Sequence, residues 1–346
     1  MCGIAGVHNA HNTNLVENML MKINHRGPDG WGAQETRAGT IGHRRLAIID
    51  VAGGRQPMHT ENDWIAFNGE IYNYRELHSK YLADQPLKTN SDTEIILQLF
   101  KKMGPQCVGL LDGMFAFAIH SGNELLLARD PLGIKPLYIS EVNEKLYYAS
   151  EIKALALISN HIREFPPGYW FHSRLGWRKY VDIAALPKLV KTIENDDDAI
   201  KHIRVTLRTA VHKRLMSDVP IGVSLSGGLD SSIVTVLARE GIQDLKSFAV
   251  GVEGSEDIRA ARLAAKQIGT IHYEYVYSKD EIMRVLPKVI YNLESFDPAL
   301  VRSAIANYFL ARLAAEHVKV FLTGEGADEL YAGYAYLNQF DDPKEL

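Results

Sequence analysis

Short apolar or alternating runs, separated by glycines and polar turns, recur along the first half of the chain. Runs of this length and spacing predict β-strands. The predicted strands cover residues 3–7, 45–50, 64–68, 115–120, 124–129 and 145–149. Residues 14–24 and 92–103 instead carry apolar side chains at helical spacing. We therefore predict an α+β domain over residues 2–185, in which helices pack on antiparallel sheets arranged in two layers.

The second half alternates helical and strand-like segments, which predicts an α/β domain whose parallel sheet is covered by helices on both faces. The predicted strands are 221–225, 247–252, 273–277 and 318–322; the predicted helices are 199–215, 231–240, 259–268 and two more before Glu316. Pro187 and an acidic run at 194–198 mark the domain boundary, so the second domain is predicted over 198–346. Ligands of such sheets bind at the carboxyl ends of the strands, and two glycine-rich segments follow predicted strands there.

Composition narrows the classes of function. A chain of 346 residues is long enough for two ordinary domains, and 46% hydrophobic with 23% charged residues is typical of a soluble globular protein. The net charge of −4 gives no attraction for polyanions and argues against a nucleic-acid partner. No apolar run reaches the roughly 20 residues that cross a bilayer. Cys2 and Cys107 have no metal-type spacing and no secretory leader precedes them, so a reducing cytoplasm is the predicted compartment.

A cysteine stands directly after the initiator methionine, followed by Gly3. Once Met1 is removed, the thiol of Cys2 lies beside a free α-amino group, whose pKa of about 8 allows it to act as the base. Taken alone, the Met-Cys pair is more typical of an ordinary small residue at a chain terminus. Motifs further along the chain reverse that interpretation.

These motifs are HRGPDG at 25–30, RRLAIID at 44–50, NGEIYN at 68–73 and SDTE at 91–94. The Asn-Gly pair alone is more typical of a hairpin turn. In combination behind a second-position cysteine, the motifs closely resemble the class II glutamine amidotransferases. The resemblance implies an Ntn-hydrolase-like sandwich for the first domain.

The resemblance also implies a role for each site residue. Cys2 attacks the side-chain amide of glutamine, and Asn68 with the backbone of Gly69 forms the oxyanion hole. Arg45 binds the α-carboxylate, because its planar guanidinium matches a carboxylate in two places. Glu70 and Asp92 hold the α-ammonium. The remaining residues of the implied glutamine site are Leu46, Ala47, Ile48 and Ile49.

The string SGGLDSS at 226–232 follows a predicted strand and precedes a predicted helix. A turn of this kind presents backbone N–H groups and the positive end of a helix to an anion. Alone it would more often be a capped helix start. It resembles the pyrophosphate loop of the N-type ATP pyrophosphatases, which implies an adenine nucleotide α-hydrolase-like fold. The Walker pattern is absent, and this favours release of pyrophosphate.

A second loop, TGEGADE at 323–329, carries three carboxylates after a predicted strand. They repel one another unless a cation lies between them, and Mg²⁺ carried on ATP is the natural candidate. The alternative is a solvated acidic loop.

Taken together, the two halves resemble the glutamine-hydrolysing asparagine synthetases along nearly the whole chain. Further strings carry this resemblance: ARDPLGIKPLY at 128–138, ASEIKAL at 149–155, PPG at 166–168 and SFAVG at 247–251. It implies that ATP contacts Leu225, Ser226, Gly227, Gly228, Asp230, Ser231, Val250, Thr323 and Gly324. Asp230 and Asp328 would hold Mg²⁺, and Glu325 would assist formation of aspartyl-adenylate. Ammonia from glutamine would then displace AMP to give asparagine.

The family continues well beyond the second loop, whereas this sequence stops at Leu346. We therefore expect a truncated ATP domain. The expected protein partner is either a second copy of the chain, in a homodimer, or a separate polypeptide that completes the ATP domain. Two alternatives stay open. The first is a glutaminase that only supplies ammonia, or a degenerate synthetase. The second is a catalytically silent nucleotide-binding module. The related β-lactam synthetases share the ATP loop but normally lack the N-terminal cysteine.

Overall fold

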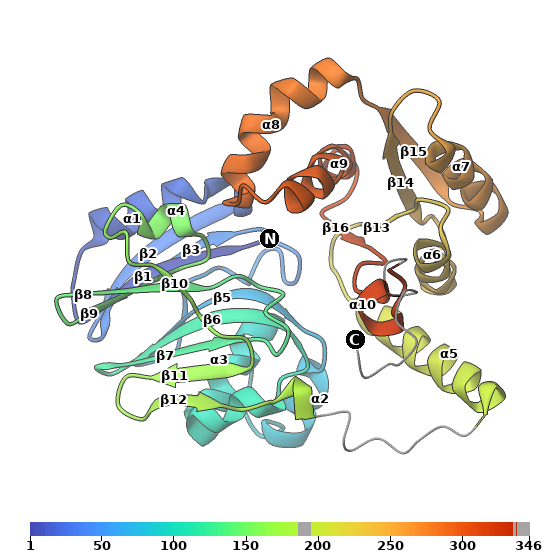
Figure 1. Ribbon diagram of the computed structural model, residues 1–346. Coiled ribbons are helices and arrows are strands. Elements are labelled where there is room, and N and C mark those ends of the chain that lie inside the picture. Colours follow the sequence, from blue (N-terminus) through green and yellow to red (C-terminus); the bar gives the residue numbers. More distant parts are fainter. Residues whose placement is uncertain (186–194, 335–336, 338–346) are drawn as a thin grey trace. The chain divides into compact units, whose positions relative to one another are not determined.

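The computed structural model describes residues 1–185, 195–334 and 337. The chain separates into two compact units, Met1–Thr192 and Ile193–Leu346 (Figure 1). The predicted boundary at Pro187 and Glu194 and the last nine residues of the second predicted domain fall outside the described residues.

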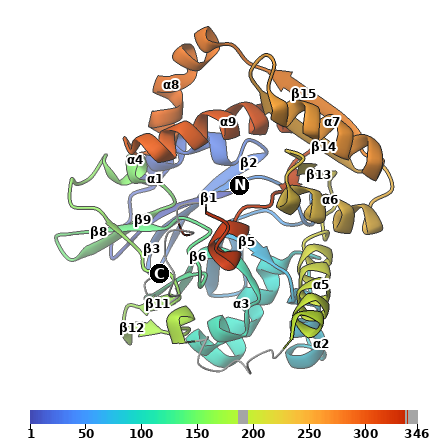
Figure 2. The same ribbon diagram turned by 45° about the vertical axis from the view of Figure 1, so that its right-hand side comes forward.

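The first unit is built on two six-stranded antiparallel sheets (Figures 1 and 2). One sheet has the order β10-β8-β9-β1-β3-β2 and the other β12-β11-β7-β6-β5-β4. The strands of the first sheet are β1 (Gly3–His8), β2 (Gly30–Thr36), β3 (Gly39–Arg45), β8 (Tyr138–Val142), β9 (Lys145–Ala149) and β10 (Arg163–Glu164). Those of the second are β4 (Met58–His59), β5 (Asp63–Ile71), β6 (Gly113–Ser121), β7 (Glu124–Arg129), β11 (Tyr169–His172) and β12 (Gly176–Lys179). Ile4 and Ile41 of one sheet share a fully buried core with Ala66 and Ala116 of the other, so the predicted sandwich is confirmed.

Helices cover the outer faces of this sandwich. On the first sheet, α1 (Thr13–Lys22) buries Val16, Met19 and Leu20, which recur at the spacing of one helical face. The side chain of Asn12 caps this helix by accepting from the Leu15 N–H. The other helical segments are η1 (Asn24–Arg26), α2 (Tyr74–Tyr81), α3 (Asp92–Met103), η2 (Gly104–Leu110) and α4 (Ile152–Leu155). Both helices predicted in this half, at 14–24 and 92–103, are confirmed.

The strand predicted at 45–50 is wrong, because β3 ends at Arg45 and the chain continues as a loop. Its apolar side chains do not join a sheet; Leu46, Ile48 and Ile49 line a cavity instead. Asn68 and Gly69 do not form a hairpin turn, since they lie inside β5 opposite Ala116 and Phe115. The sequence pattern did not predict the strands β2, β3, β4, β8, β10, β11 and β12 or the helices α2 and α4.

The second unit is a four-stranded parallel sheet of order β15-β14-β13-β16, as predicted. Its strands are β13 (Ile221–Ser224), β14 (Lys246–Gly251), β15 (Ile271–Val276) and β16 (Val320–Leu322). Its helices are α5 (Asp196–Lys213), α6 (Leu229–Gly241), α7 (Glu256–Ile268), α8 (Lys279–Leu293), α9 (Pro298–Ala315) and α10 (Ala327–Tyr331). Phe248 packs with Ala314 at the end of α9, and its neighbour Ala249 packs with Ile258 of α7. Adjacent strand residues point to opposite faces, so helices cover both sides of the sheet. Across the described ranges, none of the helices has the length and apolar character needed to cross a membrane.

Candidate functional site

Cys2 lies directly before β1, and its thiol faces the residue that follows β3. The antiparallel register pairs Gly3 with Arg44, which brings Cys2 beside Leu46. The Leu46 N–H donates to Cys2 Sγ at 3.3 Å, and the Sγ–H reaches the Leu46 carbonyl at 3.6 Å. Cys2 therefore has a defined position although it stands at the beginning of the chain.

A cavity surrounds this thiol and unites most of the residues predicted for glutamine. Those on its lining are Cys2, Arg45, Leu46, Ile48, Ile49, Gly69, Glu70 and Asp92. Two predicted residues, Ala47 and Asn68, are not on the lining. Ala47 is buried, and its N–H donates to Asp29 Oδ2 at 2.8 Å. The cavity is tight, about 30 Å³, so its walls must separate when a glutamine enters.

Five further lining residues were missed by the sequence analysis: Gly54, Gln56, Phe67, Ser91 and Thr93. Gln56 is the central one. Its Oε1 accepts from the Phe67 N–H at 2.7 Å and its Nε2 donates to Thr93 Oγ1 at 3.3 Å. Gln56 thereby ties β5 to the start of α3, a link between distant segments that no local motif signals.

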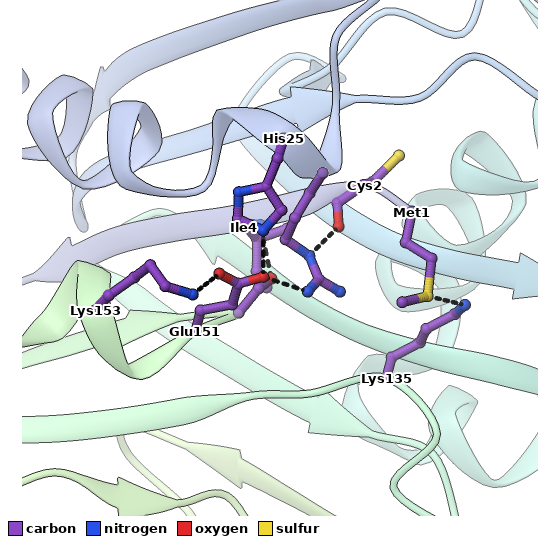
Figure 3. Close-up of polar contacts among 9 residues, drawn as sticks. Met1, Cys2, Ile4, His25, Lys135, Glu151 and Lys153 are labelled. Carbon is purple, nitrogen blue, oxygen red and sulfur yellow. Dashed lines mark hydrogen bonds and ion pairs between the residues drawn. The ribbon is translucent and has the colours of Figure 1, made fainter. Parts of the chain in front are cut away.

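The electrostatics around the thiol depend on the chain terminus. Burial raises the pKa of the Cys2 thiol, whereas the hydrogen bond from Leu46 and the nearby terminal ammonium lower it. Burial lowers the pKa of the Met1 α-amino group to about 5. This amine belongs to Met1 and stands one residue before the place where the Cys2 amine would be after processing. The Met1 side chain itself lies against Lys135, whose Nζ donates to Met1 Sδ at 3.1 Å (Figure 3).

Asn68 presents an unpartnered amide in the interior. Its side chain is 1% exposed, and neither Nδ2 nor Oδ1 has a hydrogen-bond partner among the described residues. A buried amide without partners costs about 1–3 kcal/mol, so such a group is typical of a site that a ligand completes. Gly69 follows it on β5 and lines the cavity.

Glu70 and Asp92 place two carboxyl groups at the same cavity. Asp92 begins α3, and its Oδ2 accepts from the Ile71 N–H at 2.9 Å. Burial raises the pKa of Asp92 to about 6. Burial, followed by the charge of Asp92, also raises the pKa of Glu70, whose Oε2 lacks a partner within the described part of the chain. A cation between them would restore the ionised forms, and the α-ammonium of an amino acid has the right charge.

Arg45 orders the loop that closes the cavity. Its Nη1 donates to the Val51 carbonyl at 2.8 Å, and its Nη2 donates to the Asp50 carbonyl at 2.6 Å. The guanidinium thus shapes the wall in addition to facing the cavity, which the sequence pattern did not predict.

In the second unit, the SGGLDSS loop connects β13 to α6. Ser231 Oγ accepts from the Ser226 N–H at 3.2 Å, and Ser226 Oγ accepts from the Gly228 N–H at 3.3 Å. Gly227 has a φ of +82°, and a Cβ there would lie 2.5 Å from the Ala260 carbonyl carbon, so only glycine fits. Asp230 is exposed in the first turn of α6. The loop is a compact helix start, and the first N–H groups of a helix have no intrahelical acceptors, which is typical of helix starts that bind anions.

The second glycine-rich loop meets the first at the same edge of the sheet. β13 and β16 are parallel neighbours, with Val223 opposite Leu322. A Cβ on Gly324 would lie 3.1 Å from the backbone nitrogen of Ser231, which shows how closely the loops approach. Leu225 and Val250 stand at the carboxyl ends of β13 and β14, where the Leu225 N–H donates to the Phe248 carbonyl at 2.9 Å.

The acidic residues of this second loop do not form a metal cage. Glu329 accepts a hydrogen bond from the Tyr334 hydroxyl at 2.5 Å, and Asp328 lies in the short helix α10. Throughout the described ranges, no three His, Cys, Asp or Glu side chains lie close enough together to hold an ion. A Mg²⁺ ion here would need phosphate oxygens among its ligands, which agrees with arrival on ATP.

Comparison with known proteins agrees with this division. Residues 1–170 match the glutamine amidotransferase domain family, and residues 202–343 match the asparagine synthase family. The chain is 36% identical to asparagine synthetase B [glutamine-hydrolyzing] of Escherichia coli (strain K12), across 100% of this chain and 67% of the relative. It is 37% identical to asparagine synthetase [glutamine-hydrolyzing] 1 of Bacillus subtilis (strain 168), across 100% of this chain and 60% of the relative. For asparagine synthetase [glutamine-hydrolyzing] 1 of Arabidopsis thaliana the identity is 35%, with 100% and 62% covered.

The chain thus spans between 60% and 67% of the length of these three relatives. Both family models and the relatives point to one group of enzymes. The chain belongs to the glutamine-hydrolysing asparagine synthetase family.

Proposed function

We propose that this protein hydrolyses glutamine at Cys2 and uses the ammonia in an ATP-dependent conversion of aspartate to asparagine. The observation that carries the proposal is a set of buried polar side chains on the segments that form the cavity beside Cys2. The carboxyl groups of Glu70 and Asp92 lie on the cavity lining, and one oxygen of Glu70 is buried and unpartnered among the described residues. The amide of Asn68, which precedes the lining residue Gly69 on β5, is also buried and unpartnered in the described part of the chain. These groups complement the oxyanion and the α-ammonium of a bound glutamine.

The glutaminase step follows from these positions. With Met1 removed, the Cys2 amine accepts the thiol proton, and the sulfur attacks the glutamine Cδ. The Asn68 amide and the Gly69 N–H stabilise the negative oxygen that develops. The amine returns its proton to the leaving nitrogen, so ammonia departs and a thioester remains. Water, deprotonated by the same amine, then releases glutamate. Arg45 holds the α-carboxylate, while Glu70 and Asp92 hold the α-ammonium.

The second unit would activate aspartate. The start of α6, with Ser226, Gly227, Gly228 and Ser231, would bind the pyrophosphate portion of ATP. Leu225, Val250, Thr323 and Gly324 would contact the rest of the nucleotide, and Glu325 would assist adenylation. Mg²⁺ held by the phosphates, with Asp230 and Asp328, would neutralise the charge of the leaving pyrophosphate. In the reducing cytoplasm that the sequence predicts, the Cys2 thiol would stay free.

One incubation with matched variants tests the proposal. Purified protein is mixed with Mg-ATP, aspartate and either glutamine or ammonium, and glutamate, AMP and asparagine are measured separately. We expect Cys2→Ala to abolish glutamate release while ammonium-dependent asparagine formation continues. Cys107→Ala is the control, because this second thiol is fully buried and its pKa is raised to about 12 by burial. Glutamate without AMP or asparagine would restrict the function to ammonia supply, and no glutamate from the unaltered protein would refute the glutaminase assignment.

A further inference from the structure

Glu151, which follows β9, is surrounded by three basic side chains (Figure 3). Its Oε1 accepts from Arg26 Nη1 at 2.7 Å and from His25 Nε2 at 3.0 Å, and its Oε2 accepts from Lys153 Nζ at 2.5 Å. The side chains of Arg26, Glu151 and Lys153 are all less than 10% exposed. Glu151 is therefore the shared acceptor of a buried charge cluster.

This cluster reaches the nucleophile through Arg26. The sheet ladder of β1 begins at Gly3, so the Cys2 carbonyl lies beyond the last ladder pair. Arg26 Nε donates to that carbonyl at 2.9 Å. Ser150, next to Glu151, binds Ile4 of β1. The Ser150 Oγ accepts from the Ile4 N–H at 2.9 Å, and the Ser150 N–H donates to the Ile4 carbonyl at 2.9 Å. Neighbouring residues thus hold both positions: Ser150 binds Ile4 directly, and Glu151 reaches the Cys2 carbonyl through Arg26.

Fixing the Cys2 carbonyl matters because a processed Cys2 is the first residue of the chain. Nothing precedes it to hold its backbone, and rotation about its Cα–C bond would turn the amine and the thiol together away from the cavity. A misplacement of about 1 Å between reacting groups costs about 100-fold in rate. The hydrogen bond from Arg26 to the Cys2 carbonyl opposes this rotation, in addition to the contacts of Leu46 with the thiol.

We propose that Glu151 is a positioning residue for glutamine hydrolysis: it fixes the Arg26 guanidinium, which pins the Cys2 carbonyl and so orients the amine and the thiol of the nucleophile. The inference rests on the proposed glutaminase function and adds a residue that does not touch glutamine. Burial raises the pKa of Glu151, but hydrogen bonds from His25 and Lys153 and the charge of Arg26 outweigh it and hold the pKa at about 2. The carboxylate is thus charged at any working pH.

The chemistry of the cluster requires a carboxylate. Each oxygen of Glu151 faces a cationic donor, and glutamine offers only one acceptor oxygen together with an NH₂ group that would face another donor. Glu151→Gln should therefore weaken the hold on Arg26. If the amide oxygen replaces Oε1, Arg26 loses a charged acceptor, and if the NH₂ group replaces it, Arg26 faces a donor. Glu151→Asp keeps both oxygens but is shorter by one CH₂, so it should retain part of the arrangement.

The test compares Glu151→Gln and Glu151→Asp with Glu141→Gln. Glu141 is the matched control, because it also accepts from an arginine, Arg163, but in a pair that is more than half exposed. We expect Glu151→Gln to lower kcat for glutamine about 100-fold, with KM changed less than about threefold, and Glu151→Asp to lie between it and the unaltered protein. Glu141→Gln should keep both parameters. Titration of Cys2 with iodoacetamide gives the number of reactive sites, so that kcat is expressed per folded site.

A double-mutant cycle separates positioning from general stability. If Glu151 acts through Arg26, then Arg26→Lys with Glu151→Gln should lose no more activity than the more damaged single variant. Losses that multiply, or an unchanged kcat in Glu151→Gln, would overturn the inference. If Glu151→Gln does not fold, the kcat per site of Glu151→Asp decides, and a value equal to the unaltered protein would overturn it. Absence of glutamine hydrolysis in the unaltered protein would instead refute the proposed function; the rate of Cys2 alkylation in the variants would still test the positioning, and an unchanged rate would reject it.

Discussion

Replacing Asn68 by alanine should lower kcat strongly, while the free energy of unfolding changes little or rises. Asn68 is 1% exposed and both of its side-chain polar atoms are unpartnered among the described residues. If its amide stabilises the oxyanion, removing this donor should lower kcat about 100- to 1,000-fold, equivalent to about 3–4 kcal/mol of transition-state stabilisation. The same change removes a buried amide that costs the free protein about 1–3 kcal/mol.

The stability change follows from two opposing contributions. Relief of the unpartnered amide is offset by loss of packing around the deleted atoms, roughly 1–2 kcal/mol. The midpoints of the two ranges give a rise of about 0.5 kcal/mol in the free energy of unfolding, and their limits run from a fall of about 1 to a rise of about 2 kcal/mol. For a unit of this size the midpoint of thermal unfolding would then rise by at most about 4–8 °C.

Asn73→Ala is the control, since both ends of that amide are used. Asn73 Nδ2 donates to the Leu110 carbonyl at 2.9 Å, and Oδ1 accepts from the Asp112 N–H at 3.0 Å. This variant should lose about 1–2 kcal/mol of stability and keep its kcat. The assays are glutamate release and thermal unfolding followed by circular dichroism. A kcat reduced less than tenfold in Asn68→Ala, or a midpoint that falls as far as in Asn73→Ala, would refute the reasoning.

Two further predictions concern the acidic and ATP sites. Burial raises the pKa of Asp92 to about 6, so the folded protein keeps a proton that the unfolded chain releases near pH 4, and stability should fall as pH rises from about 4 to about 6. The loss should be at most about 3 kcal/mol, and Asp92→Asn, measured by urea unfolding at several pH values, should remove it; an identical pH dependence in the variant would reject the assignment. Asp230→Ala should suppress ATP-dependent release of pyrophosphate and leave glutaminase activity intact, and unchanged release of pyrophosphate would remove Asp230 from the ATP site.

The elements that could be predicted from the sequence are those with a periodic apolar pattern of sufficient length. The strands at Glu124–Arg129 and Lys145–Ala149 are short apolar runs that begin with a charged residue, and α3 has apolar residues at helical spacing. The apolar run after Arg45 has the pattern of a strand, but Leu46, Ile48 and Ile49 line a cavity instead of joining a sheet. Short edge strands such as β10 carry only two residues and give no pattern.

The residues that line the cavity beside Cys2 were largely predictable because they lie in recognisable strings, but the contacts that support the cavity were not. Glu151 and Arg26 are 125 positions apart, and their contact exists only because β9 pairs with β1. Likewise, Gln56 joins β5 to α3 from a loop without any local signal. Long-range pairing of this kind is set by sheet topology, which a single sequence does not display.

If the thiol of a processed N-terminal cysteine is the nucleophile, the mass of active protein will show it. The protein is treated with a chloroketone analogue of glutamine until glutaminase activity is lost, and its intact mass and N-terminal peptide are measured. We predict a chain that lacks Met1 and carries one analogue on Cys2. Full glutaminase activity in a chain that retains Met1, or inactivation with the label elsewhere, would contradict the account.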